Sequence, residues 1–321
     1  MIQPSASEGS IPAPVDVKPS VRIFDWFFAL RPTLIFPLIT MILAGNNIVE
    51  IKTRHSWDVW LLLMASLSAI FGLGYLLNQF NDREGDRKNR KLYLVSGELI
   101  PRNFLIVEAT LLGLICPILL IIAGFSRIAG WLAAMLILGG VLYNFTPFAL
   151  KRTPWGGVVS GLIGGWLLIH LGGIVAGNPQ LIWREIPYIL AFASGCILTT
   201  LPDVVGDLSC GKRTFAVAFG SRTTILTALT GIAAAAVLGA WFKDWVITIP
   251  AVVSGAMLIP ASLRGSVSLA VQANKIAIFL LSVTVGWNYP IYLAGVFFYY
   301  LLARWYYRKR LGMEYPSFKT A

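Results

Sequence analysis

Apolar stretches of about 20 residues alternate along this chain with short segments that are polar or basic. A stretch of that length crosses the hydrocarbon core of a bilayer when it is helical. Lipid offers the backbone no hydrogen-bond partner, so these segments have to be helices, and the alternating pattern of a membrane β-barrel is missing from the sequence. The pattern predicts an all-α, polytopic transmembrane bundle, and its expected helices cover residues 22–45, 57–80, 103–124, 128–146, 156–176, 186–202, 223–241, 244–262, 268–286 and 289–306.

The two ends of the chain depart from this pattern. Residues 1–20 are polar and contain prolines, which predicts a flexible N-terminal tail, and residues 311–321 are expected to form a C-terminal tail. Residues 21–310 between them are expected to form one transmembrane domain. The segment Trp287-Asn288-Tyr289-Pro290 is a strong helix breaker, so the last two expected helices are either separate or one long broken helix. Ten crossings are the count that the residues themselves favour.

Composition supports a membrane protein. Only 13% of the residues are charged, against about 25% in a typical soluble domain, and 57% are hydrophobic. The net charge of +11 comes largely from the loops after the second, fourth and sixth expected helices, whereas the intervening loops are poorer in lysine and arginine. Because basic loops stay in the cytoplasm, these three loops and both termini are predicted to be cytoplasmic. We expect no nucleic-acid partner, because no basic face interleaved with aromatic residues lies outside the membrane segments.

Two acidic segments interrupt the apolar pattern in the same way. Asp82 to Asp86 and Asp203 to Asp207 both read Asp-x-x-Gly-Asp, and each follows an apolar helix and precedes a basic loop. This weak internal repeat predicts two related half-bundles. If the second helix continues, Asn78, Asp82 and Asp86 share one of its faces, because they are spaced by four residues.

Carboxylates crowded at a membrane boundary repel one another, and a hard divalent cation relieves that repulsion. Magnesium prefers oxygen ligands and typically bridges a few carboxylates to substrate phosphates. The two acidic segments therefore predict a magnesium site that grips a diphosphate. Basic and aromatic residues near the same boundary are candidates for binding that diphosphate directly or for lining its site. They are Arg90, Lys91, Tyr143, Lys151, Lys212 and Arg213.

Together these segments resemble the UbiA superfamily of intramembrane prenyltransferases. The pattern Asn78-x-x-x-Asp82-x-x-x-Asp86 with Asp203-x-x-x-Asp207 is similar to its paired aspartate-rich motifs. Further similar stretches are Leu30-Arg31-Pro32 with Ala44-Gly45, the segment from Tyr143 to Lys151, and Gly211-Lys212-Arg213-Thr214 after the second motif. The likeness covers roughly residues 22–305.

The resemblance implies nine transmembrane helices around a central cavity, one fewer than the count from the residues. It also implies magnesium-dependent transfer of a prenyl chain from an isoprenyl diphosphate to a small acceptor. Asp82, Asp86, Asp203 and Asp207 would hold the magnesium, with Asn78 assisting. We expect an integral protein of a prokaryotic inner membrane, with the mouth of its active site in the cytoplasm, surrounded by membrane lipid and without an obligate protein partner.

One segment departs from the family pattern. Many members carry an Arg-Pro pair shortly after the first motif, where this chain has Tyr93-Leu94, and Arg90 or Lys91 would then take over phosphate binding. This loop lies near the reacting end, so the acceptor class stays open. An aromatic or quinone-precursor acceptor is the first expectation, and another lipid precursor, such as a polar alcohol, is the second.

Two other classes also place acidic residues in membranes. A cation-coupled transporter would place them near mid-membrane, often at broken helices, whereas here they end helices beside basic loops. A CDP-alcohol-type membrane phosphotransferase would use metal-bound aspartates in one compact motif, whereas this chain divides them between two distant segments. Both features favour the prenyltransferase.

Overall fold

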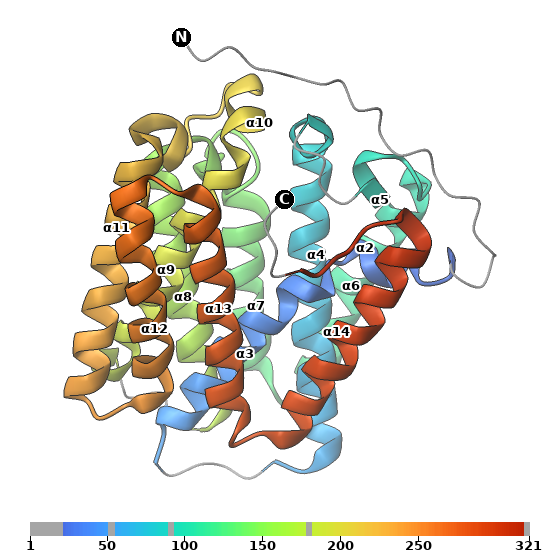
Figure 1. The fold of residues 1–321 in the computed structure, drawn as a ribbon. Helices are drawn as coiled ribbons and strands as arrows, with labels where there is room; N and C mark the ends of the chain where they lie inside the picture. The colour runs from blue at the N-terminus through green and yellow to red at the C-terminus, as the bar shows by residue number, and fades with distance from the viewer. Residues whose placement is uncertain (1–21, 51–54, 89–92, 178–181, 318–321) are drawn as a thin grey trace.

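The computed structural model describes residues 22–50, 55–88, 93–177 and 182–317. Within these ranges the regular structure is entirely helical, and the helices form one bundle (Figure 1). The expected tail 1–20 and the candidate residues Arg90 and Lys91 lie outside the described residues. The helices and short turns run in this order: α2 (Asp25–Ala29), α3 (Pro32–Ile48), α4 (Trp57–Lys88), α5 (Tyr93–Ser96), α6 (Arg102–Ile122), α7 (Ser126–Met135), the π-helix η1 (Leu136–Leu142), the 3-10 turn η2 (Leu150–Arg152), α8 (Pro154–Val175), α9 (Ile182–Leu198), the 3-10 turn η3 (Leu201–Asp203), α10 (Val204–Ser209), α11 (Phe215–Trp241), α12 (Trp245–Arg264), α13 (Val267–Gly286) and α14 (Pro290–Leu311).

The helices of the described ranges explain why two counts of crossings competed. Seven of them are long and apolar enough to span a membrane, and two shorter apolar helices, Pro32–Ile48 and Ser126–Leu142, stand beside them. The helix α14 belongs to neither group; it contains several tyrosines and Arg304, and its last turn carries Arg308, Lys309 and Arg310. It is nevertheless a separate helix, and Trp287, Asn288 and Tyr289 join it to α13.

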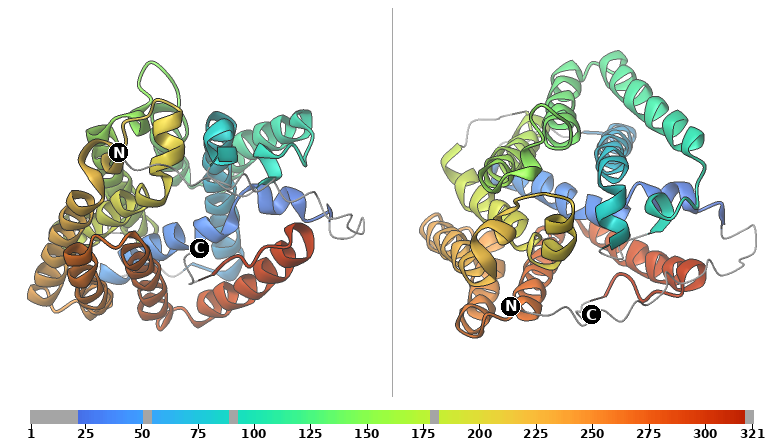
Figure 2. Two further views of the ribbon diagram at one scale, coloured as in Figure 1. Left: turned by 45° about the horizontal axis from the view of Figure 1, so that its top comes forward. Right: turned by 90° about the horizontal axis from the view of Figure 1, so that it is seen from above.

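Glycines let the central helices approach closely. The helix α8 packs against α3 on one side and α9 on the other. Beyond α9, each helix packs against the next: α9 against α11, α11 against α12, and α12 against α13 (Figures 1 and 2). Where α3 meets α8, a Cβ atom added to Gly172 would lie 2.0 Å from the carbonyl oxygen of Ile42, and one added to Gly45 would lie 1.8 Å from that of Ile169. Only glycine fits at both positions, as is common where membrane helices touch through their backbones.

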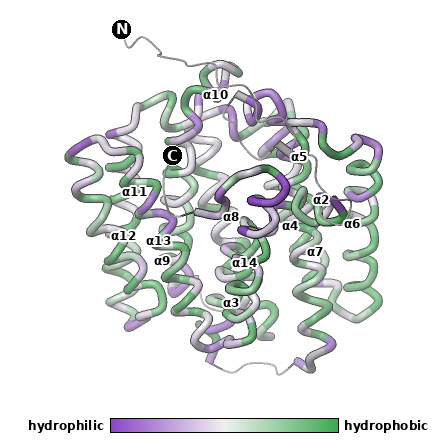
Figure 3. The backbone as a smooth tube through the Cα atoms, turned by 45° about the vertical axis from the view of Figure 1, so that its right-hand side comes forward, coloured by the Kyte–Doolittle hydropathy of each residue, from purple (hydrophilic) through white to green (hydrophobic). Residues whose placement is uncertain are grey.

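The outer surface of the bundle is apolar. Apolar residues cover most of the length of the helices, and polar residues gather at their two ends (Figure 3). The helix α6 is the clearest case: exposed side chains such as Leu111, Ile115 and Ile118 point away from the bundle. An apolar surface of this extent suits contact with lipid rather than water. The chain is therefore an integral membrane protein.

Two predicted helix boundaries differ from the structure near the acidic segments. The second expected helix was given an end at residue 80, but α4 continues to Lys88 and carries the first segment as helix. The sixth was given an end at residue 202, but α9 ends at Leu198. The 3-10 turn η3 and the six-residue α10 follow it, because Pro202 cannot donate a backbone hydrogen bond.

Candidate functional site

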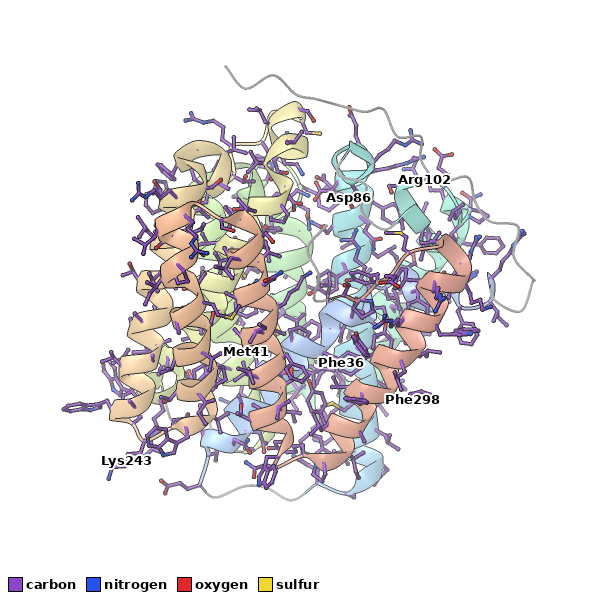
Figure 4. The ribbon with its side chains drawn as sticks, in the orientation of Figure 1. Phe36, Met41, Asp86, Arg102, Lys243 and Phe298 are labelled. Carbon is purple, nitrogen blue, oxygen red and sulfur yellow. The ribbon has the colours of Figure 1, made fainter. Side chains whose placement is uncertain are left out.

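The first acidic segment lies on the last turns of α4. Because the helix is continuous, Asn78, Asp82 and Asp86 project from one face, as their spacing predicted. Figure 4 places Asp86 and Arg102 near one end of the bundle and Lys243 at the other. The backbone nitrogen of Arg213 donates to the carbonyl oxygen of Arg152 at 3.0 Å, so the basic loops after η1 and α10 meet at the same end as the first acidic segment.

Asp82 is the centre of this arrangement. Its Oδ1 atom accepts from the ammonium of Lys151 at 2.7 Å and from that of Lys212 at 2.5 Å. Both lysine side chains are almost fully buried. An ammonium is expensive to bury without a partner, so the two lysines are held inside the protein by the carboxylate that they share.

Lys212 also joins the two acidic segments. Its Nζ atom lies 3.6 Å from Oδ1 of Asp207, and its backbone nitrogen donates to the carbonyl oxygen of Asp207 at 2.9 Å. Asp207 is buried in α10, and Asp203 is half-buried at the start of that helix. The two segments, distant in sequence, therefore contact the same cation.

The two lysines respond differently to their surroundings. Burial opposes the charge of Lys212, but Asp82, the hydrogen bond to it and Asp207 together outweigh burial, so the pKa of Lys212 is raised. Burial is the larger influence on Lys151, and it lowers the pKa of that ammonium despite the attraction of Asp82. Lys212 is thus the more firmly charged member of the pair.

Asn144 is a site residue that the sequence reasoning missed. Its Oδ1 atom accepts from Nδ2 of Asn78 at 2.7 Å and from Nζ of Lys151 at 2.9 Å. Its own Nδ2 donates to the carbonyl oxygens of Gly139 and Gly140 in the π-helix η1. The side chain is 1% exposed and joins α4 to the loop that carries Lys151. An amide next to an apolar helix end was the available signal.

Arg31 was quoted only as part of a family-like stretch, yet it contacts the site. Its Nη2 atom donates to Oδ2 of Asp86 at 3.0 Å, and both groups are buried. The residue lies between α2 and α3 in the left-handed region, with φ 50°, which directs its side chain toward α4. A backbone conformation of this kind is uncommon outside glycine, so the sequence gave no signal of it.

Tyr143 lies directly after η1, in the loop that carries Lys151. Burial raises the pKa of its phenol, and the negative charges of Asp82, Asp203 and Asp207 act in the same direction. Its carbonyl oxygen accepts from the backbone nitrogen of Lys151 at 3.2 Å. By contrast, Arg213 is exposed at the rim, and the side chain of Tyr93 lies outside the described part of the structure.

The donor atoms fit magnesium in chemical type. Four carboxylates and the oxygens of amide side chains are hard donors, and magnesium is typically bound by one or two carboxylates together with water and substrate phosphates. Among the described residues, no three acidic, histidine or cysteine side chains form a ready-made cage. Because Lys151 and Lys212 already neutralise Asp82, the arrangement suits an ion that arrives with an anionic substrate.

The sequence model described as the UbiA prenyltransferase family matches residues 33–283, well over half of the chain. The chain belongs to the UbiA prenyltransferase family. A comparison with curated proteins found no match. As a member of this family the protein is a prenyltransferase, which decides against the transporter and the CDP-alcohol phosphotransferase. The matched region begins in α3 and ends within α13, so α14 lies beyond it.

Solved structures of UbiA homologues share the fold. A UbiA homologue from Archaeoglobus fulgidus bound to GPP and Mg²⁺ aligns with a TM-score of 0.64 at 17% identity, over 84% of this chain and 99% of that one. The same kind of protein bound to DMAPP and Mg²⁺ gives 0.63 at 15% identity, over 82% and 99%. A structure described as a digeranylgeranylglyceryl phosphate synthase in membranes gives 0.58 at 15% identity, over 82% and 98%. The likeness confirms the helical-bundle architecture.

Proposed function

We propose that this UbiA family member transfers the prenyl group of an isoprenyl diphosphate to a small acceptor at the end of the bundle where the two acidic segments meet. The observation that carries the proposal is Lys212, which contacts Asp82 from the first segment and Asp207 from the second. A single small ion or anion can therefore interact with both segments at once. The solved homologues, described with Mg²⁺ and with DMAPP or GPP, support the same pairing of ligands.

In this proposal Asp82, Asp86, Asp203 and Asp207 hold magnesium, and the amide of Asn78 assists. Bound magnesium would supply stabilisation of the negative charge that develops on the leaving diphosphate. If Asp82 bound magnesium, it would release the ammoniums of Lys151 and Lys212. Both ammoniums could then bind phosphate oxygens, because a diphosphate offers more acceptor atoms and more negative charge than one carboxylate. Lys151 and Lys212 would thus change partner from a carboxylate to the diphosphate.

Loss of the diphosphate from an allylic carbon breaks the carbon–oxygen bond and leaves a positive charge on the prenyl group. Preorganised cations near the leaving group lower the barrier because they need not reorient as charge develops. The acceptor then forms the new bond to that carbon and loses a proton. Tyr143 lies beside the acids and offers an aromatic ring for the allylic cation to contact.

Residues 89–97 help to select the acceptor in this proposal. The structure describes residues 93–97 of this segment, which include α5. Our first choice is an aromatic or quinone-precursor acceptor. A polar alcohol is the second choice, because one of the similar solved structures is described as a digeranylgeranylglyceryl phosphate synthase. Arg90 and Lys91 would bind phosphate from this loop, and Tyr93 would help to select the acceptor.

A direct assay tests the proposal. The purified protein in lipid is given GPP or a longer diphosphate, magnesium, and each acceptor class in turn, and the products are identified by mass spectrometry. We expect a prenylated product that depends on magnesium. Tyr93→Ala should change the ranking of the acceptors and leave the ranking of chain lengths unchanged. The opposite result would contradict the role of this loop.

The location is also part of the proposal. We place the site at the cytoplasmic face of a prokaryotic inner membrane, because the basic loops lie at its end of the bundle. Single cysteines introduced at Arg152 and Arg213 should react with a membrane-impermeant thiol reagent only when the cytoplasmic side is open. A cysteine in place of Lys243 should show the opposite sidedness. If all three are labelled from one side, the topology is wrong.

A further inference from the structure

The helix α14 lies beyond the family match, yet it packs along the flank of the bundle that α2 and α3 form (Figures 1 and 2). Aromatic residues of α14 contact residues in and next to α2. The ring of Tyr306 stacks on that of Phe28 with centroids 3.9 Å apart and an interplanar angle of 4°, and Tyr307 meets the same ring edge-on at 5.3 Å. Trp305 contacts Phe24 in the same way. These contacts run from Phe24, just before α2, to Phe28 near its end, while Trp26 stays exposed.

A buried ion pair fixes this contact. Asp25 in α2 receives a two-pronged contact from Arg310 in α14: Nη2 donates to Oδ2 at 3.0 Å, and Nε donates to Oδ1 at 3.0 Å. The hydroxyl of Tyr306 donates to the same Oδ1 at 2.5 Å. Asp25 and Arg310 are each 4% exposed, and Tyr306 is fully buried. A buried pair of this kind is weak evidence for stability, but its fork geometry fixes the relative position of two elements.

From α2 the chain leads directly to the active site. The carbonyl oxygen of Ala29, the last residue of α2, accepts from Nε2 of Gln79 in α4 at 2.7 Å. Two residues later, Arg31 adopts its left-handed conformation and donates to Asp86. The position of the Arg31 guanidinium is therefore determined by how α2 sits against α4, and α14 holds α2 in that place.

The segment after α14 adds a second attachment. The hydroxyls of Tyr315 and Thr33 are 3.1 Å apart, which ties this segment to the first turn of α3. Nζ of Lys275 in α13 donates to the carbonyl oxygen of Ser317 at 2.8 Å. Residues 290–317 thus hold both sides of the junction that contains Arg31.

We propose that residues 290–317 form a strap that positions Arg31 and, through it, the metal-binding carboxylate of Asp86, with Asp25, Tyr306 and Arg310 as positioning residues. The strap acts through α2 and touches neither diphosphate nor acceptor. This inference rests on the proposed function, because its first test measures magnesium-dependent prenyl transfer. It assigns a role in the reaction to a helix that lies beyond residues 33–283, the part that the family model matches.

The test measures the magnesium concentration that gives half-maximal activity, and separately the turnover at saturating magnesium. Arg310→Gln and Tyr306→Phe should raise the half-maximal concentration by roughly tenfold, as partners that orient metal ligands typically do, with a smaller loss of saturated turnover. Arg308→Gln and Lys309→Gln alter exposed cations on the same helix and serve as matched controls that should behave like the wild type. Arg310→Lys should recover only part of the affinity, because it restores the charge without the fork.

A double-mutant cycle tests the route. In an Arg31→Gln background, Arg310→Gln should change the magnesium dependence no further, because the strap acts through Arg31. Equal and additive effects would overturn the proposal, and so would unchanged magnesium dependence in folded Arg310→Gln and Tyr306→Phe proteins. If Arg310→Gln fails to fold, Tyr306→Phe keeps the stacked ring and carries the test.

A second readout separates this inference from the proposed function. Thermal stabilisation by GPP with magnesium is measured in the wild type and in the variants, without any acceptor. If the wild type is stabilised but transfers no prenyl group, the proposed reaction is wrong. The strap is then tested by whether the variants need more magnesium than the wild type for the same thermal stabilisation. If GPP and magnesium do not stabilise the wild type, the proposed function and the strap's role are both refuted.

Discussion

The two acidic segments have the same pattern of residues but different backbones. Asp82 and Asp86 lie on α4, a continuous helix of 32 residues. Asp203 ends a 3-10 turn and Asp207 lies in the six-residue α10, after the main helix has already ended. The first segment is thus held by a long rigid element, whereas the second is held by a short one.

The two segments also differ in charge compensation. Asp82 contacts two lysines and Asp86 contacts Arg31, so both aspartates of the first segment are paired with buried cations. Asp207 of the second segment shares Lys212 at the longer distance of 3.6 Å. The first segment is thus fixed by the longer helix and by the closer ion pairs. The predictions below test where the two segments act together and where they differ.

Removal of the metal should have the largest effect. If both segments act only through magnesium, EDTA should abolish transfer, and added magnesium should restore it. Calcium should restore less, because its coordination is larger and less strictly octahedral. Product formation measured by mass spectrometry checks this. Full activity in EDTA would contradict the metal role of both segments.

Substitution of single acids comes next. Asp82→Asn and Asp203→Asn should each lower turnover by about a hundredfold or more, since a metal supplies several kcal/mol of charge stabilisation. The double variant should be far from additive, because the two segments act as one unit. Glu84→Gln, an exposed acid of the same helix end, should leave turnover nearly unchanged. Additive losses would show that the segments work independently.

The lysines should separate the two segments more finely. Lys212→Met should lower turnover by about 10- to 100-fold, in the range of lost preorganised charge, because it removes the cation that both segments contact. Lys151→Met should have the smaller effect, since that lysine contacts only the first segment. Arg213→Met is the exposed control next in sequence. A larger loss for Lys151 than for Lys212 would reverse the comparison.

Asn144 should give the smallest effect on turnover and a clear effect on stability. Asn144→Leu removes both acceptor contacts and leaves the half-buried Asn78 amide and the buried Lys151 ammonium with one partner fewer, which costs about 1–3 kcal/mol in unfolding free energy. The melting temperature in detergent checks this. Thr146→Val, an exposed position two residues later, is the control. An unchanged melting temperature would contradict the linking role of Asn144.

Much of this arrangement could be predicted from the sequence. The length of the apolar stretches gave the helices, because a bilayer sets that length, and the spacing of Asn78, Asp82 and Asp86 gave their shared face. Lys151 and Lys212 were selected because they lie in loops on the acidic side, and the structure places both against Asp82. These conclusions need only local periodicity and the rule that basic loops lie on one side.

The remainder depends on tertiary contacts. Arg31 reaches Asp86 only because its backbone is left-handed and α2 packs on α4, and no local pattern specifies either. Asn144 joins the site through a π-helix, which has no simple sequence signal. The predicted end of α4 was too early because a polar helix end outside the hydrocarbon looks like a loop, and the predicted end of α9 was too late because the break before Pro202 was not expected. The expected roles of Arg90 and Lys91 stay predictions.

The length of α4 has a consequence for how the enzyme meets its donor. A helix of 32 residues is about 48 Å long, well beyond the roughly 30 Å of hydrocarbon, so its acidic end stands at the depth of the lipid headgroups. A donor with a phosphate head and a prenyl tail already lies at that depth and in that orientation. Under the proposed function, a long-chain donor of this kind would reach the enzyme by lateral diffusion in the plane of the bilayer. The rate would then follow the mole fraction of donor among the lipids, and added inert lipid would slow the reaction by surface dilution.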